Sequence, residues 1–190
     1  MSSNTTCQRI IDGLRRDAAA MGFTMSCDDL TGALLCTLAA SKPGGRLLEI
    51  GTGVGEGSAW LLAGMSADAT LDTVEREPER VAVARRHLGH DPRLRFHEGD
   101  AATFLHACQE RYDLIFADTF PGKFTDVDET LSLLAPGGLY LVDDLFPQPN
   151  WRDNHQPRVD RLRAELAARA DLRVVRLDWS TGLTLCARGS

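Results

Sequence analysis

The run from Leu47 to Gly57 constrains the fold of this chain more than any other stretch. It reads LLEIGTGVGEG, an apolar segment of strand character followed by a glycine at every second position, and it continues into the helical-looking run 58–65. Glycines at a turn from a strand to a helix let the backbone approach a ligand without interference from a Cβ atom. The run therefore predicts a loop that binds a nucleotide cofactor in an α/β fold.

Two acidic residues narrow the class of cofactor. A dinucleotide fingerprint, G-x-G-x-x-G, that begins at Gly51 and Gly53 would need its third glycine at position 56, which is Glu56. Glu56 and the nearby Glu49 are both unfavourable beside a pyrophosphate, whereas S-adenosylmethionine carries an ammonium and a sulfonium group that carboxylates attract. The pattern E-x-G-x-G-x-G after a strand resembles the loop of S-adenosylmethionine-dependent methyltransferases, and it disfavours a nicotinamide dehydrogenase.

Length, composition and charge exclude several other classes. The chain has 190 residues, 43% of them hydrophobic, and a formal net charge of −6 at pH 7. This acidic balance argues against nucleic acid or an anionic membrane as the partner, because both are usually bound by basic patches. The five cysteines are scattered without C-x-x-C spacing, which is typical of a reduced protein. No signal-peptide pattern or membrane-length apolar run is visible, so we expect a cytoplasmic protein.

Apolar runs rich in β-branched residues alternate with helical patterns along the chain, which predicts a mostly parallel sheet with helices on both faces. Only five residues separate the last two apolar runs, which suits an antiparallel hairpin. We therefore expect a doubly wound, seven-stranded α/β sheet in one domain, 1–190, with a helical cap at 1–42 and a cofactor-binding core at 43–190. The expected strands are 46–50, 70–75, 94–97, 112–117, 139–142, 172–177 and 183–187, and the expected helices are 5–21, 28–40, 57–65, 77–88, 101–108, 127–134 and 158–170.

Acidic side chains lie at the ends of five expected strands in succession. They are Glu49, Glu75, Asp100, Asp118 and the pair Asp143 and Asp144. One strand-end carboxylate is commonly a turn former or a helix N-cap, but five in succession favour a shared ligand beyond the carboxyl ends of the strands. Glu75 is placed to accept both ribose hydroxyls of the cofactor, and Asp100 to accept the adenine amine. Glu49 favours the cationic amino-acid end, and Asp118 would lie next to the reactive methyl.

Taken together, these motifs resemble the O-methyltransferases related to catechol and caffeoyl-coenzyme A O-methyltransferases. The resemblance runs from about Met25 to the end of the chain, through MS at 25–26, GALL at 32–35, the glycine loop, GDA at 99–101, DLIFAD at 113–118, GG at 137–138, DD at 143–144 and TGLTL at 181–185. It implies a class I methyltransferase fold and a homodimer formed through the N-terminal helices. The cofactor contacts that it implies are Ser26, Glu49, Gly51, Thr52, Gly53, Gly55, Ser58, Glu75, Arg76, Gly99, Asp100, Ala101 and Asp118.

The resemblance also implies a divalent metal, held in that family by an aspartate after the fourth strand and an Asp-Asn pair after the fifth. The corresponding ligands here are Asp118, Asp143 and Asp144, whose oxygens suit Mg²⁺. Such a metal would lower the pKa of an acceptor hydroxyl and orient its oxygen. This chain departs from the family twice, because Asp144 replaces the asparagine and Pro121 replaces the family's lysine. The aspartate pair could instead be a hydrogen-bonded strand exit without metal.

The loops after Asp118 and Asp144 should line the pocket for the methyl acceptor. Its candidate lining residues are Phe120, Phe124, Phe146, Trp151 and His155, whose apolar faces favour an aromatic or otherwise planar acceptor. Lys123 reaches this pocket if residues 120–122 form a tight bulge, and otherwise it is a surface lysine. His155 can act as a general base near neutral pH, or it is a surface histidine before a helix.

The sequence thus predicts methyl transfer from S-adenosylmethionine to a hydroxyl of a small molecule, with Asp118, Lys123 and His155 as the catalytic candidates. Two alternatives remain open. One is N- or carboxyl-methylation on the same scaffold, and the other is a non-catalytic module that binds S-adenosylmethionine.

Overall fold

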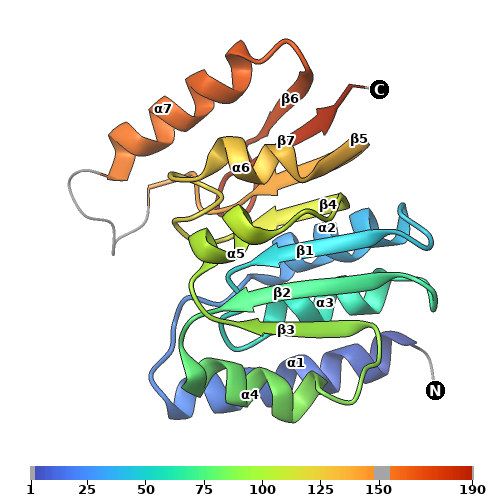
Figure 1. The fold of residues 1–190 in the computed structure, drawn as a ribbon. Helices are drawn as coiled ribbons and strands as arrows, with labels where there is room; N and C mark the ends of the chain where they lie inside the picture. The colour runs from blue at the N-terminus through green and yellow to red at the C-terminus, as the bar shows by residue number, and fades with distance from the viewer. Residues whose placement is uncertain (1–2, 148–154, 190) are drawn as a thin grey trace.

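A central sheet covered by helices on both faces forms the core of the computed structural model, which describes residues 3–147 and 155–189 (Figure 1). The strands are β1 (Arg46–Ile50), β2 (Thr70–Glu75), β3 (Leu94–Glu98), β4 (Tyr112–Ala117), β5 (Leu134–Val142), β6 (Leu172–Leu177) and β7 (Leu183–Arg188). The helices are α1 (Ser3–Ala20), α2 (Asp29–Ala40), α3 (Glu56–Gly64), α4 (Pro78–Leu88), α5 (Ala101–Ala107), α6 (Val127–Ser132) and α7 (His155–Ala168).

The strand order is β3-β2-β1-β4-β5-β7-β6, which confirms the predicted doubly wound sheet. Strand β7 runs antiparallel to both β5 and β6, and the other neighbouring pairs are parallel. The chain passes from β1 to β2 and β3 on one side and from β4 to β5 on the other. The order therefore reverses between β1 and β4, where doubly wound sheets bind their ligands.

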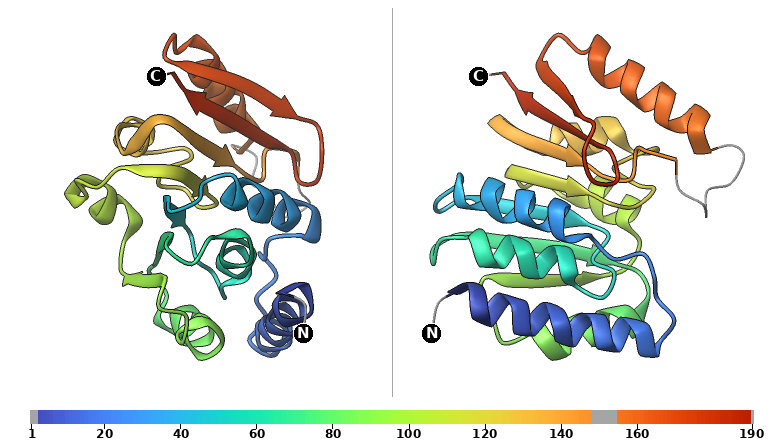
Figure 2. Two further views of the ribbon diagram at one scale, coloured as in Figure 1. Left: turned by 90° about the vertical axis from the view of Figure 1, so that its right-hand side faces the viewer. Right: turned by 180° about the vertical axis from the view of Figure 1, so that it is seen from behind.

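Alternation of side chains along the strands builds one apolar core on each face of the sheet. Leu47 and Leu114 pack under α1 to α4, whereas Leu48 and Ile115 pack under α5 to α7. Figure 2 shows the same division, with α1, α2 and α3 on one face and α5, α6 and α7 on the other. No helix within the described residues is long and apolar enough to cross a membrane.

The largest differences from the predicted element boundaries are the starts of β5 and α7. Strand β5 begins at Leu134 rather than at position 139, because Tyr112 pairs with Leu134 across a bulge before the regular register resumes at Leu114 and Leu139. The Pro-Gly-Gly run thus lies inside the strand, and α6 ends earlier than expected. Helix α7 begins at His155 rather than at 158, since Pro157 occupies the first turn, where a helix needs no N–H group.

Candidate functional site

The glycine loop turns from β1 into α3 at the reversal of strand order. The backbone N–H groups of Gly51 and Thr52 both donate to the carbonyl of Val74 in β2, at 3.0 and 3.1 Å. The φ angle of Gly51 is 105°, a value that a residue with a Cβ atom rarely adopts. The loop after β4 lies directly beside it, because Asp118 N donates to Ile50 O at 3.0 Å.

Glu75 at the end of β2 anchors the tip of this loop. Its Oε2 accepts a 2.9 Å hydrogen bond from Gly53 N, and its Oε1 accepts from the backbone N–H groups of Arg76 and Glu77 at 3.0 and 3.1 Å. The residue is only 8% exposed, yet it lines a cavity of about 500 Å³. Glu75 is therefore held in one orientation at the cavity wall.

This cavity, termed the cofactor cavity below, lies at the carboxyl ends of β1, β2, β3 and β4. It brings together many of the residues that the sequence predicted for the cofactor: Gly51, Gly53, Glu75, Arg76, Gly99, Asp100, Ala101 and Asp118. Asp100 also caps α5, since its Oδ1 accepts from Thr103 N at 2.9 Å, and that bond lowers the pKa of Asp100. Asp100 can therefore cap α5 and also contact a ligand in the cavity.

Three predicted cofactor residues lie beneath the loop instead of in the cavity. Glu49, Thr52 and Ser58 are 1%, 4% and 0% exposed. Oε2 of Glu49 accepts hydrogen bonds from Ser58 Oγ and from Thr73 Oγ1, and Thr73 in turn lies 2.6 Å from the hydroxyl of Thr52. Burial raises the pKa of Glu49 to about 7, with a further increase from Glu75. These groups support the loop from below.

The remaining two predicted contacts lie elsewhere around the loop. Gly55 adopts a φ of 103° and packs against α4, where an added Cβ would lie 3.0 Å from Leu88 Cδ1. Ser26 is exposed and lines a small cavity of about 20 Å³ together with Glu49 and Asp118.

Phe23 and Arg80 also line the cofactor cavity, and the sequence did not predict them. An added Cβ on Gly53 would lie 3.2 Å from Cζ of Phe23, so the ring packs directly on the loop. The guanidinium of Arg80 lies 4.9 Å from the Phe23 ring centroid and 3.7 Å from Oε1 of Glu75. No recognisable motif marks Phe23, which comes from the connection between α1 and α2.

A second cavity of about 790 Å³, termed the acceptor cavity below, adjoins the cofactor cavity. The two share Met25, Arg76, Asp118, Thr119 and Phe120. Other residues of the acceptor cavity come from the loops after β4 and β5, from α7 and from the final hairpin: Lys123, Phe124, Asp143, Asp144, His155, Arg158 and Thr181. The structure thus brings together the three catalytic candidates, Asp118, Lys123 and His155.

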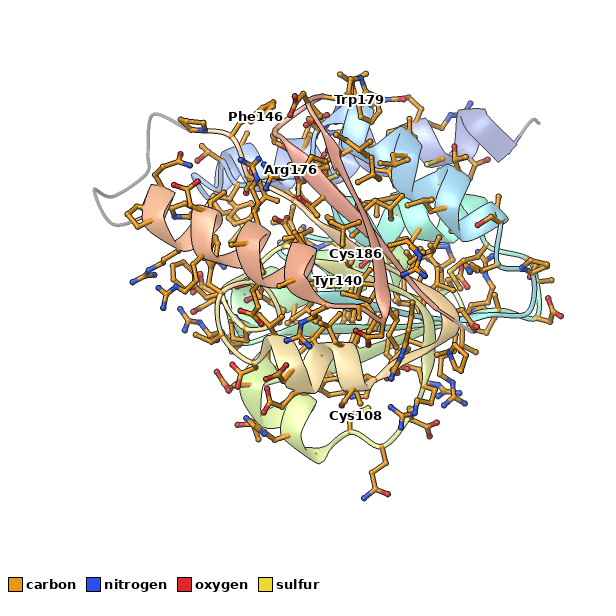
Figure 3. All side chains as sticks on the ribbon, turned by 90° about the horizontal axis from the view of Figure 1, so that it is seen from above. Cys108, Tyr140, Phe146, Arg176, Trp179 and Cys186 are labelled. Atoms are coloured by element: carbon orange, nitrogen blue, oxygen red, sulfur yellow. The ribbon has the colours of Figure 1, made fainter. Side chains whose placement is uncertain are left out.

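Aromatic rings form one wall of the acceptor cavity. The ring of Phe124 packs edge-on against Phe120 and His155, at centroid distances of 5.3 and 5.0 Å. Burial and the charge of Lys123 lower the pKa of His155. Phe146 does not line this cavity, because it packs against Gly182 beside the hairpin of β6 and β7 (Figure 3). Trp151 lies outside the described residues.

Lys123 is buried, at 4% exposure, which decides between the two alternatives for this residue. The chain folds back tightly after Phe120, whose carbonyl accepts from Phe124 N at 2.8 Å, while Gly122 N donates to Thr125 O at 2.8 Å. This turn carries Nζ of Lys123 to 2.8 Å from the carbonyl oxygen of Asp143 and 3.9 Å from Oδ1 of Asp118.

The carboxylates around Lys123 have raised pKa values. Burial raises the pKa of Asp118 well above its ordinary range, the neighbouring Asp143 and Asp144 add to the increase, and Lys123 opposes it. Burial and Asp144 raise the pKa of Asp143 to about 6, against the hydrogen bonds from Thr181 and from the backbone N–H of Asp144. Burial and mutual repulsion thus disfavour the charged forms of these carboxyl groups, and the charge of Lys123 favours them.

The resemblance implied that Asp118, Asp143 and Asp144 hold a divalent metal. Within residues 3–147 and 155–189, no group of three or more His, Cys, Asp or Glu side chains is arranged to hold a metal ion. Oδ1 of Asp143 already accepts hydrogen bonds from Thr181 Oγ1 and Asp144 N, and the Lys123 ammonium donates to the Asp143 carbonyl and lies 3.9 Å from Asp118. Two of the expected ligands, Asp118 and Asp143, thus lie beside the ammonium of Lys123.

A doubly wound sheet with a glycine loop, an anchored acid at the end of β2 and an adjoining second cavity defines the class I methyltransferase fold. The model of the family described as a methyltransferase domain matches residues 48–145, and the chain belongs to this family.

A mycobacterial relative agrees with this assignment. A protein of Mycobacterium bovis named "Putative O-methyltransferase" is 37% identical over 139 residues, which cover 70% of this chain and 62% of that relative. The chain thus spans less than two thirds of the length of that relative.

Two solved structures share the fold. The O-methyltransferase TomG of Streptomyces achromogenes in complex with SAM has a TM-score of 0.83 and 24% identity, covering 95% of this chain and 90% of TomG. A "putative caffeoyl-CoA O-methyltransferase" of Staphylococcus aureus has a TM-score of 0.79 and 23% identity, covering 94% and 92%. At these identities the likeness shows the fold alone.

Proposed function

We propose that this chain is an S-adenosylmethionine-dependent O-methyltransferase that acts on a hydroxyl group of a small planar molecule. One observation carries the proposal: the cofactor cavity and the acceptor cavity meet at Asp118, Thr119 and Phe120. A methyl donor in the first cavity and an acceptor in the second would therefore face each other at the end of β4. The names of the relatives and of the solved structures support the O-methyl chemistry.

The residues of the cofactor cavity fit S-adenosylmethionine. Glu75 can accept the ribose hydroxyls while it stays bonded to Gly53 N, and Asp100 can accept the adenine amine beside Ala101. Phe23, packed on Gly53, would cover the cofactor from the side of the α1–α2 connection. Bound there, S-adenosylmethionine supplies an electrophilic methyl group on a sulfonium.

The acceptor cavity offers groups that can prepare a hydroxyl for attack. The Lys123 ammonium can donate a hydrogen bond to the acceptor oxygen and stabilise the negative charge that develops on it. His155, whose pKa lies below its ordinary value, is neutral near pH 7 and can take the hydroxyl proton. The Phe120 and Phe124 rings favour a planar acceptor, and the Arg158 guanidinium lies 4.9 Å from the Phe120 ring centroid.

Two measurements test this function. Calorimetry should give a micromolar dissociation constant for S-adenosylhomocysteine, on the order of −8 kcal/mol, and far weaker binding of NADH. Methyl-labelled S-adenosylmethionine should then label phenols or catechols in preference to matched anilines and benzoates. Tighter binding of NADH would exclude the methyltransferase function, and preferred labelling of anilines or benzoates would instead support N- or carboxyl-methylation. Light scattering tests the homodimer that the family resemblance implies.

A further inference from the structure

We propose that the ammonium of Lys123 takes the place of the divalent metal in this site, so that methyl transfer by this chain requires no metal ion. The inference about transfer rests on the proposed function. The inference about metal binding does not, because it concerns the charge and the donor atoms of the site alone.

Lys123 lies beside two of the three residues expected to hold the metal. Its Nζ lies 2.8 Å from the carbonyl oxygen of Asp143 and 3.9 Å from Oδ1 of Asp118. A divalent cation bound to these residues would lie close to a buried positive charge. Because the two cations repel each other in a site of low dielectric constant, the ammonium excludes the metal.

One carboxylate oxygen of Asp143 is already engaged by two hydrogen-bond donors. Oδ1 of Asp143 accepts hydrogen bonds from the Thr181 hydroxyl and from Asp144 N, the latter at 2.7 Å. These donors would be left without this acceptor if the oxygen turned to a metal. Asp143 is 3% exposed, so water could not readily replace the lost hydrogen bonds.

The turn that carries Lys123 is held in place by contacts with β1 and β5. The hydroxyl of Tyr140 in β5 donates to the carbonyl of Gly122, the residue before Lys123. Gly122 itself has a φ of 83° and lies against β1, where an added Cβ would come within 2.6 Å of Ile50 Cδ1. A lysine on such a fixed turn cannot easily withdraw to admit a metal.

Every bond and proton change in the methyl transfer can be made without a metal. The acceptor oxygen forms a bond to the methyl carbon while the carbon–sulfur bond breaks, and the sulfur keeps that electron pair. The hydroxyl proton passes to His155 and then to water. Lys123 stays protonated throughout and stabilises the oxygen by hydrogen bonding, which is one of the tasks that a Lewis acid would otherwise perform.

The test is a Mn²⁺ titration followed by electron paramagnetic resonance, with Mn²⁺ as the probe of the divalent site. Three proteins are compared: the wild type, Lys123→Met and Lys42→Met. Lys42 is the other lysine of the chain, and it is bonded to Gly137 O far from the acceptor cavity. Circular dichroism and S-adenosylhomocysteine binding establish that each variant is folded. A Lys123→Gln variant replaces Lys123→Met if the latter does not fold.

We expect the wild type and Lys42→Met to bind Mn²⁺ only above about 1 mM, and removal of the Lys123 charge to tighten binding at least about tenfold. Wild-type methyl transfer should be equal in EDTA and in Mg²⁺.

Stoichiometric Mn²⁺ binding to the wild type at micromolar concentration would overturn the proposal, as would activity that EDTA abolishes and Mg²⁺ restores. A folded Lys123 variant that gains no Mn²⁺ affinity would show that the lysine is not what excludes the metal. Absence of transfer with every acceptor would refute the proposed function and leave the Mn²⁺ result to be judged separately.

Discussion

Arg15 in α1 donates a 3.0 Å hydrogen bond from its Nε to Oε2 of Glu56, the first residue of α3. Glu56 is 3% exposed, so its carboxylate depends on this partner and on the N-terminus of α3. Position 56 is where a dinucleotide fingerprint would need a glycine. In this chain the same position ties the N-terminal helix to the cofactor loop.

Removal of the arginine should therefore destabilise the fold. Arg15→Met leaves the Glu56 carboxylate buried without its partner, and we expect a loss of roughly 1–3 kcal/mol in the free energy of unfolding. This is less than for a fully buried ion pair, because the Arg15 side chain is 38% exposed. Urea unfolding measures the loss. Arg16→Met, at an exposed neighbouring position, should change stability by no more than about 0.5 kcal/mol. Equal effects of the two changes would refute the structural role of Arg15.

Glu75→Gln tests the cofactor cavity. The amide cannot accept hydrogen bonds through both of its polar atoms, so the ribose and the backbone N–H groups of Gly53, Arg76 and Glu77 must compete for one oxygen. We expect S-adenosylhomocysteine to bind on the order of 10- to 100-fold more weakly, as for other hydrogen bonds to a charged group. Glu98→Gln, at the exposed end of β3, is the matched control. An unchanged dissociation constant for Glu75→Gln in calorimetry would mean that Glu75 does not bind the cofactor.

The topology was predictable because it follows from local patterns. Glycines after β1, the alternation of apolar runs with helical patterns, and the short 178–182 connection each determine one feature of the sheet. The early start of β5 was not predictable. Its Pro-Gly-Gly run resembles a break, and only the pairing of Leu134 with Tyr112 through a bulge keeps it in the sheet.

The candidate site was predictable where residues follow strands, and not where they depend on tertiary contacts. Glu75 and Asp100 lie at the cofactor cavity because the carboxyl ends of parallel strands meet at one edge. Phe23 reaches the cavity only because the α1–α2 connection folds over Gly53, and no periodicity marks it. The burial of Lys123 depends on contacts between Gly122, Ile50 and Tyr140, which lie far apart in the sequence.

Glu49 predicts a pH dependence of stability. Its pKa rises from 4.5 to about 7 on burial, so the folded chain keeps a proton that the unfolded chain releases above pH 4.5. The free energy of unfolding should therefore fall as the pH rises from 4.5 to 7 and then level off. Glu49→Gln removes this titration, and its stability relative to the wild type should increase by up to roughly 3 kcal/mol over that range. Urea unfolding at pH 5 and pH 8 measures the difference, and a constant difference between the two proteins would contradict the prediction.

His155 predicts a pH dependence of the rate. The pKa of His155 lies below its ordinary value of 6.5. His155 should therefore become protonated, and methyl transfer should slow, only when the pH falls below 6.5. His155→Gln should lower kcat by about 100-fold at pH 7 and remove the acid limb of the rate profile. His90→Gln, at an exposed position, should leave the profile unchanged. An acid limb that persists in His155→Gln would assign the proton transfer to another group.

Gly122→Ala tests the turn that buries Lys123. Gly122 has a φ of 83°, and an added Cβ would lie 2.6 Å from Ile50 Cδ1, whereas Gly137 has a similar φ of 71° and open space around it. Both alanine variants should lose about 1 kcal/mol to backbone strain. Only Gly122→Ala adds a steric overlap, so its total loss of stability should exceed that of Gly137→Ala by a further 1–3 kcal/mol or so. The overlap should also displace Lys123, so kcat should fall in Gly122→Ala alone. Equal urea midpoints and equal kcat values in the two variants would show that this turn does not hold the lysine in place.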